Sequence, residues 1–497
     1  MILDAQTLFP GDDDASCWCR HNVPLFECSD AEIERTYGFR WRMFHSHLKL
    51  TPEGYVVTEF HPDVPWAGIH NTISCSAGHH FYEGRWIRND RYLDDYARFW
   101  FSPDAAPRSY SFWIADALYA RYLVNGNAAL LSECLDPLVA NFEAWQRERS
   151  DDNGLYWQID DRDGMEYQIS GSGCRPTINS YLFADARAIA GIARIAGRSG
   201  LAARFEEEAE RIRKLTRKLL WDDKARFFKT LPTRKSLEAH LSRYGEERMP
   251  PDQKPDELVA VRELQGYLPW TFGLMAESGF NDVWSHLDDE QGFAGKCGLS
   301  TAERRNPYWR AGPDAHTHDC LWRGSSWPFA TSHTLMGLAN AIDQGNAENR
   351  KALYFSLLGQ YARAHRLETP DGVVPWIDES MHPDTGEWVT RSVLLAGGGD
   401  DAERGRNYNH STFVDLVVTG LVGLRPSEDK TLVSVRPCIP ETALDYYCLD
   451  GVLYHGKSLT IAYDRCGDRY GFGIGLHVFA DGKRLLGSES GEFSLCG

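Results

Sequence analysis

Paired amphipathic helices joined by short turns recur along this 497-residue chain, and this repeat constrains the fold more than any other feature. Apolar residues at helical spacing form one stripe over 113–124, the turn NGN follows at 125–127, and a second stripe covers 131–145. Another pair has its stripes over 182–196 and 201–219, with GRSG as the turn. Further helices are expected at 267–279, 327–343, 348–365 and 411–424. Helical hairpins in series predict a closed ring of paired helices, the (α/α)6 barrel.

The two ends of the chain have different patterns. Residues 1–60 are expected to be irregular or strand-like, and EGYVVTEF at 53–60 is the clearest strand because of its β-branched and aromatic residues. Past the barrel, polar and apolar residues alternate, and Asp481 and Gly482 are typical of a hairpin turn. The sequence therefore predicts a mainly α protein of three units: an N-terminal segment (1–60), a catalytic barrel (61–426) and a small C-terminal antiparallel β-sandwich (427–497).

The net charge of −18 excludes several partners. Because this charge repels phosphate backbones and anionic lipid surfaces, and no Lys/Arg-rich run opposes it, we expect neither nucleic-acid nor membrane binding. The first thirty residues lack a basic start followed by an apolar core, so no signal peptide is expected and the predicted location is cytoplasmic. The twelve Cys are expected to be free thiols. The sequence leaves the oligomeric state open, a homo-oligomer included.

Aromatic residues and long polar loops point to a carbohydrate site. The chain has 16 Trp, 22 Tyr and 23 Phe, and aromatic rings stack on the apolar faces of sugars. Long loops without regular structure, here 303–326 and 373–388, are usually functional in a compact domain. A third charged and Pro-containing stretch, 232–262, is expected to be a mobile insertion or a lid.

Carboxylates in two distant loops fit glycoside hydrolysis. An inverting glycosidase needs a protonated carboxyl for the leaving oxygen and an ionised carboxylate that activates water on the opposite face of the sugar. The Gly-rich segment 162–186 offers Asp163 and Glu166, directly before a helix. The second loop offers Asp378, Glu379 and Glu387.

Four motifs together resemble a known group of enzymes. They are DGME (163–166), WRGSSWPF (322–329), DESMHPDTGEW (378–388) and NYNHSTFVDLVVTGLVGL (407–424). In this order they resemble the six-hairpin glycosidases of clan G, and they look closest to glycoside hydrolase family 63 with its mannosylglycerate and glucosylglycerate hydrolase branch. The resemblance covers roughly residues 60–425. It implies an (α/α)6 barrel, inversion at the anomeric carbon, and chemistry without a metal or other cofactor.

The resemblance also implies roles for single residues. The family's general acid is the Asp of a GxDNSP-like motif, and its place is taken by Glu166 in GMEYQ. Since Asp has become Glu and the NSP is absent, Asp163 stays an alternative acid. The family's general base falls on Glu379. The family's WRGPxWP motif, which lines the sugar subsite, carries over to Trp322, Arg323 and Trp327.

Other residues are candidates for sugar binding because guanidinium and imidazole groups fix hydroxyls and aromatic rings stack on sugars. These are Arg85, Trp86, His80, Arg175, Tyr408 and His410. The predicted function is an inverting glycosidase that acts on a small or oligosaccharide glycoside. The resemblance favours an α-glucoside or α-mannoside and leaves a rhamnoside or an arabinofuranoside open.

Two other functions remain possible at this point. A sugar epimerase or isomerase also uses an (α/α)6 barrel but transfers protons through histidines, for which His79, His80, His316, His318 and His410 are candidates. These histidines lack the spaced third ligand of a metal site, so no metal is predicted. A non-catalytic carbohydrate-binding protein would need the Trp and Arg residues but neither Glu166 nor Glu379.

Overall fold

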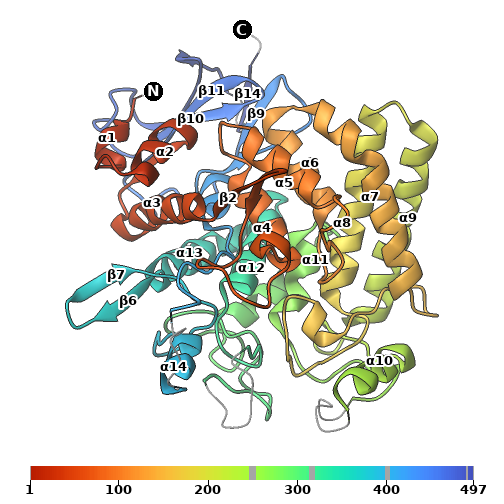
Figure 1. Ribbon diagram of the computed structural model, residues 1–497. Helices are drawn as coiled ribbons and strands as arrows, with labels where there is room; N and C mark the ends of the chain where they lie inside the picture. Colours follow the sequence, from red (N-terminus) through yellow and green to blue (C-terminus); the bar gives the residue numbers. More distant parts are fainter. Residues whose placement is uncertain (1, 246–252, 313–319, 398–402, 488–490, 496–497) are drawn as a thin grey trace.

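A ring of buried helices forms the centre of the molecule (Figure 1). The computed structural model describes residues 2–245, 253–312, 320–397, 403–487 and 491–495. The inner elements are α4 (Ser74–Gly84), α6 (Ile114–Asn125), α8 (Pro176–Ile195), η4 (Leu264–Tyr267) with α11 (Leu268–Thr271), α12 (Pro328–Asp343), and α15 (Phe413–Asp415) with η7 (Leu416–Leu421). Each packs against the next, and α15 packs against α4, which closes the ring. This is the (α/α)6 barrel that the repeated hairpins predict.

Outer helices cover this ring. They are α3 (Ala31–Ser46), α5 (Arg91–Phe99), α7 (Ala128–Arg149), α9 (Ser199–Leu220) and α13 (Lys351–Ala364). The first predicted turn shows how local sequence sets a hairpin. Helix α6 ends at Asn125 and is followed by Gly126, whose φ of 70° is left-handed, and Asn127 caps α7 by accepting a hydrogen bond from the Ala129 amide. The hairpins over 113–145 and 182–219 are therefore confirmed.

The N-terminal segment joins both the barrel and the C-terminal sheet. Its helix α3 packs against α13 and α15, and its strand β1 (Leu25–Cys28) pairs with β10 (Tyr446–Tyr454). The prediction of an irregular or strand segment over 1–60 is thus wrong for α3, because Ile33, Tyr37 and Phe44 give this stretch a buried helical face. The strand expected near 53–60 is present as β3 (Gly54–Val57), which pairs with β2 (Leu48–Thr51).

The C-terminal residues form two antiparallel sheets. One has the order β1, β10, β11 (Lys457–Asp464), β12 (Gly475–Ala480), β13 (Lys483–Arg484), and the other the order β14 (Glu492–Ser494), β9 (Leu432–Val435), β8 (Leu424–Arg425). Asp481 and Gly482 both have positive φ, 49° and 77°, and turn the chain between β12 and β13 as predicted. The proposed unit boundaries at 61 and 427 remain predictions.

The remaining regular elements of the described ranges lie between or outside these helices and sheets. They are α1 (Ala5–Leu8), α2 (Asp14–Asn22), α10 (Arg234–Tyr244), α14 (Val389–Ala396), β4 (Trp221–Asp222), β5 (Phe227–Phe228), β6 (Arg366–Thr369), β7 (Gly372–Pro375), and the 3-10 turns η1 (Ile69–Asn71), η2 (Asp160–Arg162), η5 (Asn281–Leu287) and η6 (Glu348–Arg350). None of the helices in the described ranges is long and apolar enough to cross a bilayer.

Two expectations need correction. The helix expected over 267–279 already ends at Thr271, because Gly273 adopts a left-handed φ of 71°. Part of the expected loop over 232–262 is the helix α10, which a reciprocal capping box between Thr233 and Ser236 starts. Residues 246–252 of that stretch lie outside the described residues, so its role as a lid stays a prediction.

Candidate active site

A cavity of about 530 Å³ collects most of the residues that the motifs single out. Its wall is formed by loops that precede or follow the inner helices, and it contains both glutamates of the proposed acid and base pair. The predicted residues on this wall are Glu166, Glu379, Trp322, Trp327, Tyr408 and His410. Residues about two hundred positions apart in the sequence thus meet at one site, as a ring of helices allows.

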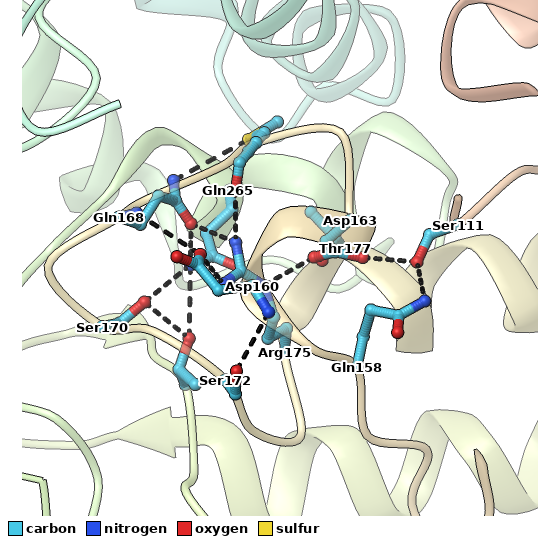
Figure 2. A network of polar contacts seen from close by, with 12 residues as sticks. Ser111, Gln158, Asp160, Asp163, Gln168, Ser170, Ser172, Arg175, Thr177 and Gln265 are labelled. Carbon is cyan, nitrogen blue, oxygen red and sulfur yellow. Dashed lines mark hydrogen bonds and ion pairs between the residues drawn. The ribbon is translucent and has the colours of Figure 1, made fainter. Parts of the chain in front are cut away.

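The loop that carries Glu166 is held by a buried arginine (Figure 2). Arg175 donates to the Asp163 carboxylate at 2.6 Å, to that of Asp160 at 2.8 Å, and to the Met165 carbonyl at 2.9 Å. Asp163 also accepts hydrogen bonds from Ser111 and Thr177, and neither Asp163 nor Arg175 is exposed. Because these groups are hydrogen-bonded to one another inside the protein, they fix the loop and do not reach the cavity.

This network corrects two predictions. Asp163 is not on the cavity wall, so the alternative acid is set aside in favour of Glu166. Arg175 is not a sugar ligand either, since its guanidinium is used within the loop. The three-residue spacing does not show this difference. Gly164, which lies between the two acids, has a left-handed φ of 78°, so the chain turns between Asp163 and Glu166.

Glu166 has the environment of a general acid. Its carboxyl Oε2 lies 3.6 Å from the Cys320 thiol, and burial, reinforced by the charges of Asp161 and Asp160, raises the pKa of Glu166 to about 8. A carboxyl with such a pKa is mostly protonated at neutral pH. It can therefore give a proton to a leaving oxygen, as the acid of a glycosidase must.

The WRGSSWPF segment links the two carboxylate loops. The Trp322 amide donates to the Glu166 carbonyl at 3.2 Å, and Ser326 exchanges two backbone hydrogen bonds with Met381, at 2.7 and 2.9 Å. The rings of Trp322 and Trp327 are stacked with centroids 4.2 Å apart. The segment thus sets the acid and base loops relative to each other and adds an aromatic surface to the cavity.

Glu379 lies beside a positive charge. Its Oε1 is 3.5 Å from Arg404, and the Arg404 guanidinium lies 4.7 Å from the centre of the Trp66 ring. Asp378, the neighbouring acid, is fully buried and accepts a hydrogen bond from the Glu379 amide. A guanidinium close to Glu379 favours the ionised carboxylate that a general base requires.

Other predicted sugar ligands lie elsewhere in the molecule. Arg85 and Trp86 both bind the Asp415 carboxylate, at 2.8 Å, inside the helical ring. His80 is buried between the Asn409 carbonyl and the Tyr96 hydroxyl. Arg323 donates to the Tyr167 carbonyl at 3.0 Å, which supports the loop of Glu166. These four residues do not line the cavity, and each is explained by a contact within the protein.

The histidines proposed for an epimerase or isomerase do not gather at the cavity in the described ranges. His79 is buried against Trp113 and His333, away from the cavity wall. His316 and His318 lie outside the described residues. Among the described histidines, His410 is the one on this wall, and it pairs with Glu59.

Several wall residues were not predicted. They are Glu59, Phe60, Trp66, Cys75, Tyr110, Cys320 and Arg404. Glu59 and Phe60 lie at the end of the strand predicted over 53–60, and in the structure they follow β3, between this strand and the barrel. The others lie outside the four motifs, so the fold and not a motif identifies them as part of the site.

The buried network around Arg175 is expected to stabilise the fold. Arg175→Met leaves the Asp160 and Asp163 carboxylates buried without their guanidinium. We therefore expect the free energy of unfolding to fall by about 3–5 kcal/mol. Denaturant unfolding followed by circular dichroism measures this loss. Arg204→Met, which removes an exposed ion pair with Glu143, is the control and should cost less than about 1 kcal/mol. Similar losses in both variants would contradict the assigned role of Arg175.

The helical ring and its cavity, with two carboxylates among aromatic residues, define a glycoside hydrolase of the six-hairpin type. The family model described as "Mannosylglycerate hydrolase MGH1-like glycoside hydrolase domain" matches residues 69–411. The chain therefore belongs to this family of glycoside hydrolases, and the predicted resemblance to family 63 is confirmed.

Solved structures share the fold. A chain named "Sialidase" is 35% identical over 99% of this chain, with a TM-score of 0.84, and this chain spans 44% of its length. The GH63 mannosylglycerate hydrolase from Thermus thermophilus in complex with glucose is 14% identical over 77% of this chain and all of its own, with a TM-score of 0.54. The GH78 family rhamnosidase of Bacillus sp. GL1 is 12% identical over 89% of this chain and 40% of its own, again with a TM-score of 0.54.

Proposed function

We propose that the chain is an inverting glycoside hydrolase in which Glu166 is the general acid and Glu379 the general base. One observation carries the proposal: both glutamates line a single aromatic cavity, where burial raises the pKa of Glu166 to about 8 and the Arg404 guanidinium lies 3.5 Å from Glu379. Two carboxyl groups in unlike environments are the pattern of an acid and base pair.

The proposed reaction is a single displacement. Glu166 gives its proton to the glycosidic oxygen while the bond between this oxygen and the anomeric carbon breaks. Glu379 takes a proton from a water molecule, whose oxygen bonds to the anomeric carbon from the opposite side. The products are an alcohol and a sugar of inverted configuration, with Glu166 ionised and Glu379 protonated, and proton exchange with solvent restores both groups.

The proposed substrate class is an α-mannoside or an α-glucoside of small size. The family description and the Thermus structure both name mannosylglycerate hydrolases. Arg162 and Arg404 on the cavity wall also supply guanidinium groups for a carboxylate on the substrate, such as that of glycerate. A sialoside, which carries a carboxylate on the sugar itself, is the second candidate because of the 35% identical chain named "Sialidase".

Proton NMR of the first turnovers tests the reaction. Hydrolysis of α-mannosylglycerate, α-glucosylglycerate, an α-L-rhamnoside and an α-sialoside is followed, and the anomer released first is read before mutarotation. We expect cleavage of the mannoside or glucoside with the β-anomer appearing first. Release of the α-anomer would overturn the inverting mechanism, and cleavage of the sialoside alone would favour the second candidate.

The same samples test the non-hydrolytic alternatives. An epimerase would convert free mannose or glucose without any glycoside, and a binding protein would leave every substrate intact while still retaining sugar. We expect neither result, because the described wall brings together two glutamates but only one histidine, which Glu59 already binds.

Trp66 is expected to bind substrate by stacking. Its side chain lines the cavity and is 51% exposed, so it can be truncated without opening the core. We expect Trp66→Ala to lower kcat/KM by about 3- to 10-fold, mainly through KM, as aromatic contacts contribute about 0.5–1.5 kcal/mol. Steady-state kinetics measure the effect, and Trp66→Phe, which keeps an aromatic face, is the control. An unchanged KM in Trp66→Ala would contradict the stacking role.

A further inference from the structure

A cluster of three unlike side chains in the cavity wall is not used by the proposed reaction. Glu59 follows strand β3, Cys75 lies in the first turn of α4, and His410 lies in the loop before α15. All three line the cavity and are at most 4% exposed. One ligand atom from each, a carboxylate oxygen, a thiol sulfur and an imidazole nitrogen, lies within 4.8 Å of the other two.

The spacing of these atoms suits a bound cation. The Cys75 sulfur is 3.7 Å from Nε2 of His410. Two such ligands on a tetrahedral zinc ion, with bonds of about 2.3 Å to sulfur and about 2.0 Å to nitrogen, lie about 3.5 Å apart. Glu59 and His410 contact each other directly, so an ion would replace this contact, and their side chains would separate to take positions around it.

The carboxylate has a second oxygen available. Oε2 of Glu59 is buried and has no hydrogen-bond partner within the ranges that the structure describes. Burying an unpaired carboxylate oxygen is costly, and a cation removes this cost. The unpartnered oxygen is an observation independent of the clustering, and it also points to a positively charged ligand.

The geometry points to a zinc site formed by Glu59, Cys75 and His410, with its fourth position open to the cavity for water or a sugar hydroxyl. Zinc fits because thiolate, imidazole and carboxylate are its usual ligands, whereas magnesium and calcium prefer oxygen alone. On binding, the Cys75 thiol loses its proton to solvent and its sulfur bonds to the ion. Because the site shares a wall with Glu166, the ion would lie where it can orient the substrate.

Metal analysis of the full chain tests this site without any turnover, so the result does not depend on the proposed hydrolase activity. The protein is loaded with zinc, freed of unbound metal by gel filtration, and its zinc content is measured by mass spectrometry. We expect one zinc ion per chain in the native sequence. Cys75→Ser and Glu59→Gln should each weaken zinc binding by about 10- to 100-fold or more.

Cobalt substitution identifies the sulfur ligand. Cobalt bound to a thiolate gives a sulfur-to-metal charge-transfer absorption, which we expect in the native chain and not in Cys75→Ser. Cys466→Ser removes an exposed thiol far along the chain and should leave both the absorption and the zinc content unchanged.

Two results would overturn the site. One is a native chain that retains no zinc, and the other is equal zinc retention in the native chain, Cys75→Ser and Glu59→Gln. Circular dichroism shows whether each variant is folded. Glu59→Gln keeps the shape of the side chain, so it decides the matter if Cys75→Ser does not fold.

Discussion

Glu379→Gln is expected to lower kcat by about 10²- to 10⁴-fold while KM changes little. The amide keeps the size of the side chain but cannot take a proton from water, and general-base catalysis typically contributes a factor of this size. Its contact with Arg404 changes from an ion pair to a weaker hydrogen bond, which leaves the cavity shape intact. Steady-state kinetics on the best substrate of the NMR panel measure the loss.

Matched variants separate this role from a general effect on the loop. Glu387 lies eight positions further on, is exposed and accepts a hydrogen bond from the Ser392 hydroxyl. The variant Glu387→Gln should therefore retain activity within about twofold. Azide provides a second control: with Glu379→Ala it should attack the anomeric carbon in place of activated water and give a glycosyl azide of inverted configuration. A near-native kcat in Glu379→Gln would show that Glu379 is not the general base, and Glu59 would become the candidate for this role.

The barrel could be predicted from sequence because its hairpins are encoded locally. The turn at 125–127 supplies both a left-handed glycine and a capping asparagine, and the apolar stripes of α8 and α9 keep helical spacing over their full lengths. Helix α3 could not be predicted in the same way because the charged Arg40 interrupts its buried face and Gly38 lies in its middle. Only its packing against α13 and α15 makes this stretch a clear part of the ring.

The site could be predicted only as far as motifs mark it. The motifs identify Glu166 and Glu379 from their loops, but the choice between Glu166 and Asp163 depends on the turn at Gly164 and on the partners of Arg175. Such tertiary contacts leave no trace in residue spacing. Other wall residues could not be predicted for a similar reason, because they lie outside the motifs.

Glu166→Gln should show a loss of activity that depends on the leaving group. The amide cannot protonate the glycosidic oxygen, so kcat/KM for an alkyl glycoside such as a glycerate glycoside should fall by about 10²- to 10⁴-fold. The leaving group of a glycosyl fluoride or a dinitrophenyl glycoside departs without a proton, so the hydrolysis of these substrates should fall far less. Equal losses on both kinds of substrate would show that Glu166 does not act as the acid.

The pH dependence of kcat/KM then identifies the acid by its pKa. The acid must be protonated to act, so activity is lost as the pH rises through its pKa. Burial and the charges of Asp161 and Asp160 raise the pKa of Glu166 to about 8, whereas burial raises that of Asp163 only to about 6, with Arg175 opposing the rise. We therefore expect the alkaline limb of the native enzyme near pH 8, and we expect Glu166→Gln to lose this limb on the dinitrophenyl glycoside. An alkaline limb near pH 6 that persists in Glu166→Gln would return the acid role to Asp163, despite its position behind the cavity wall.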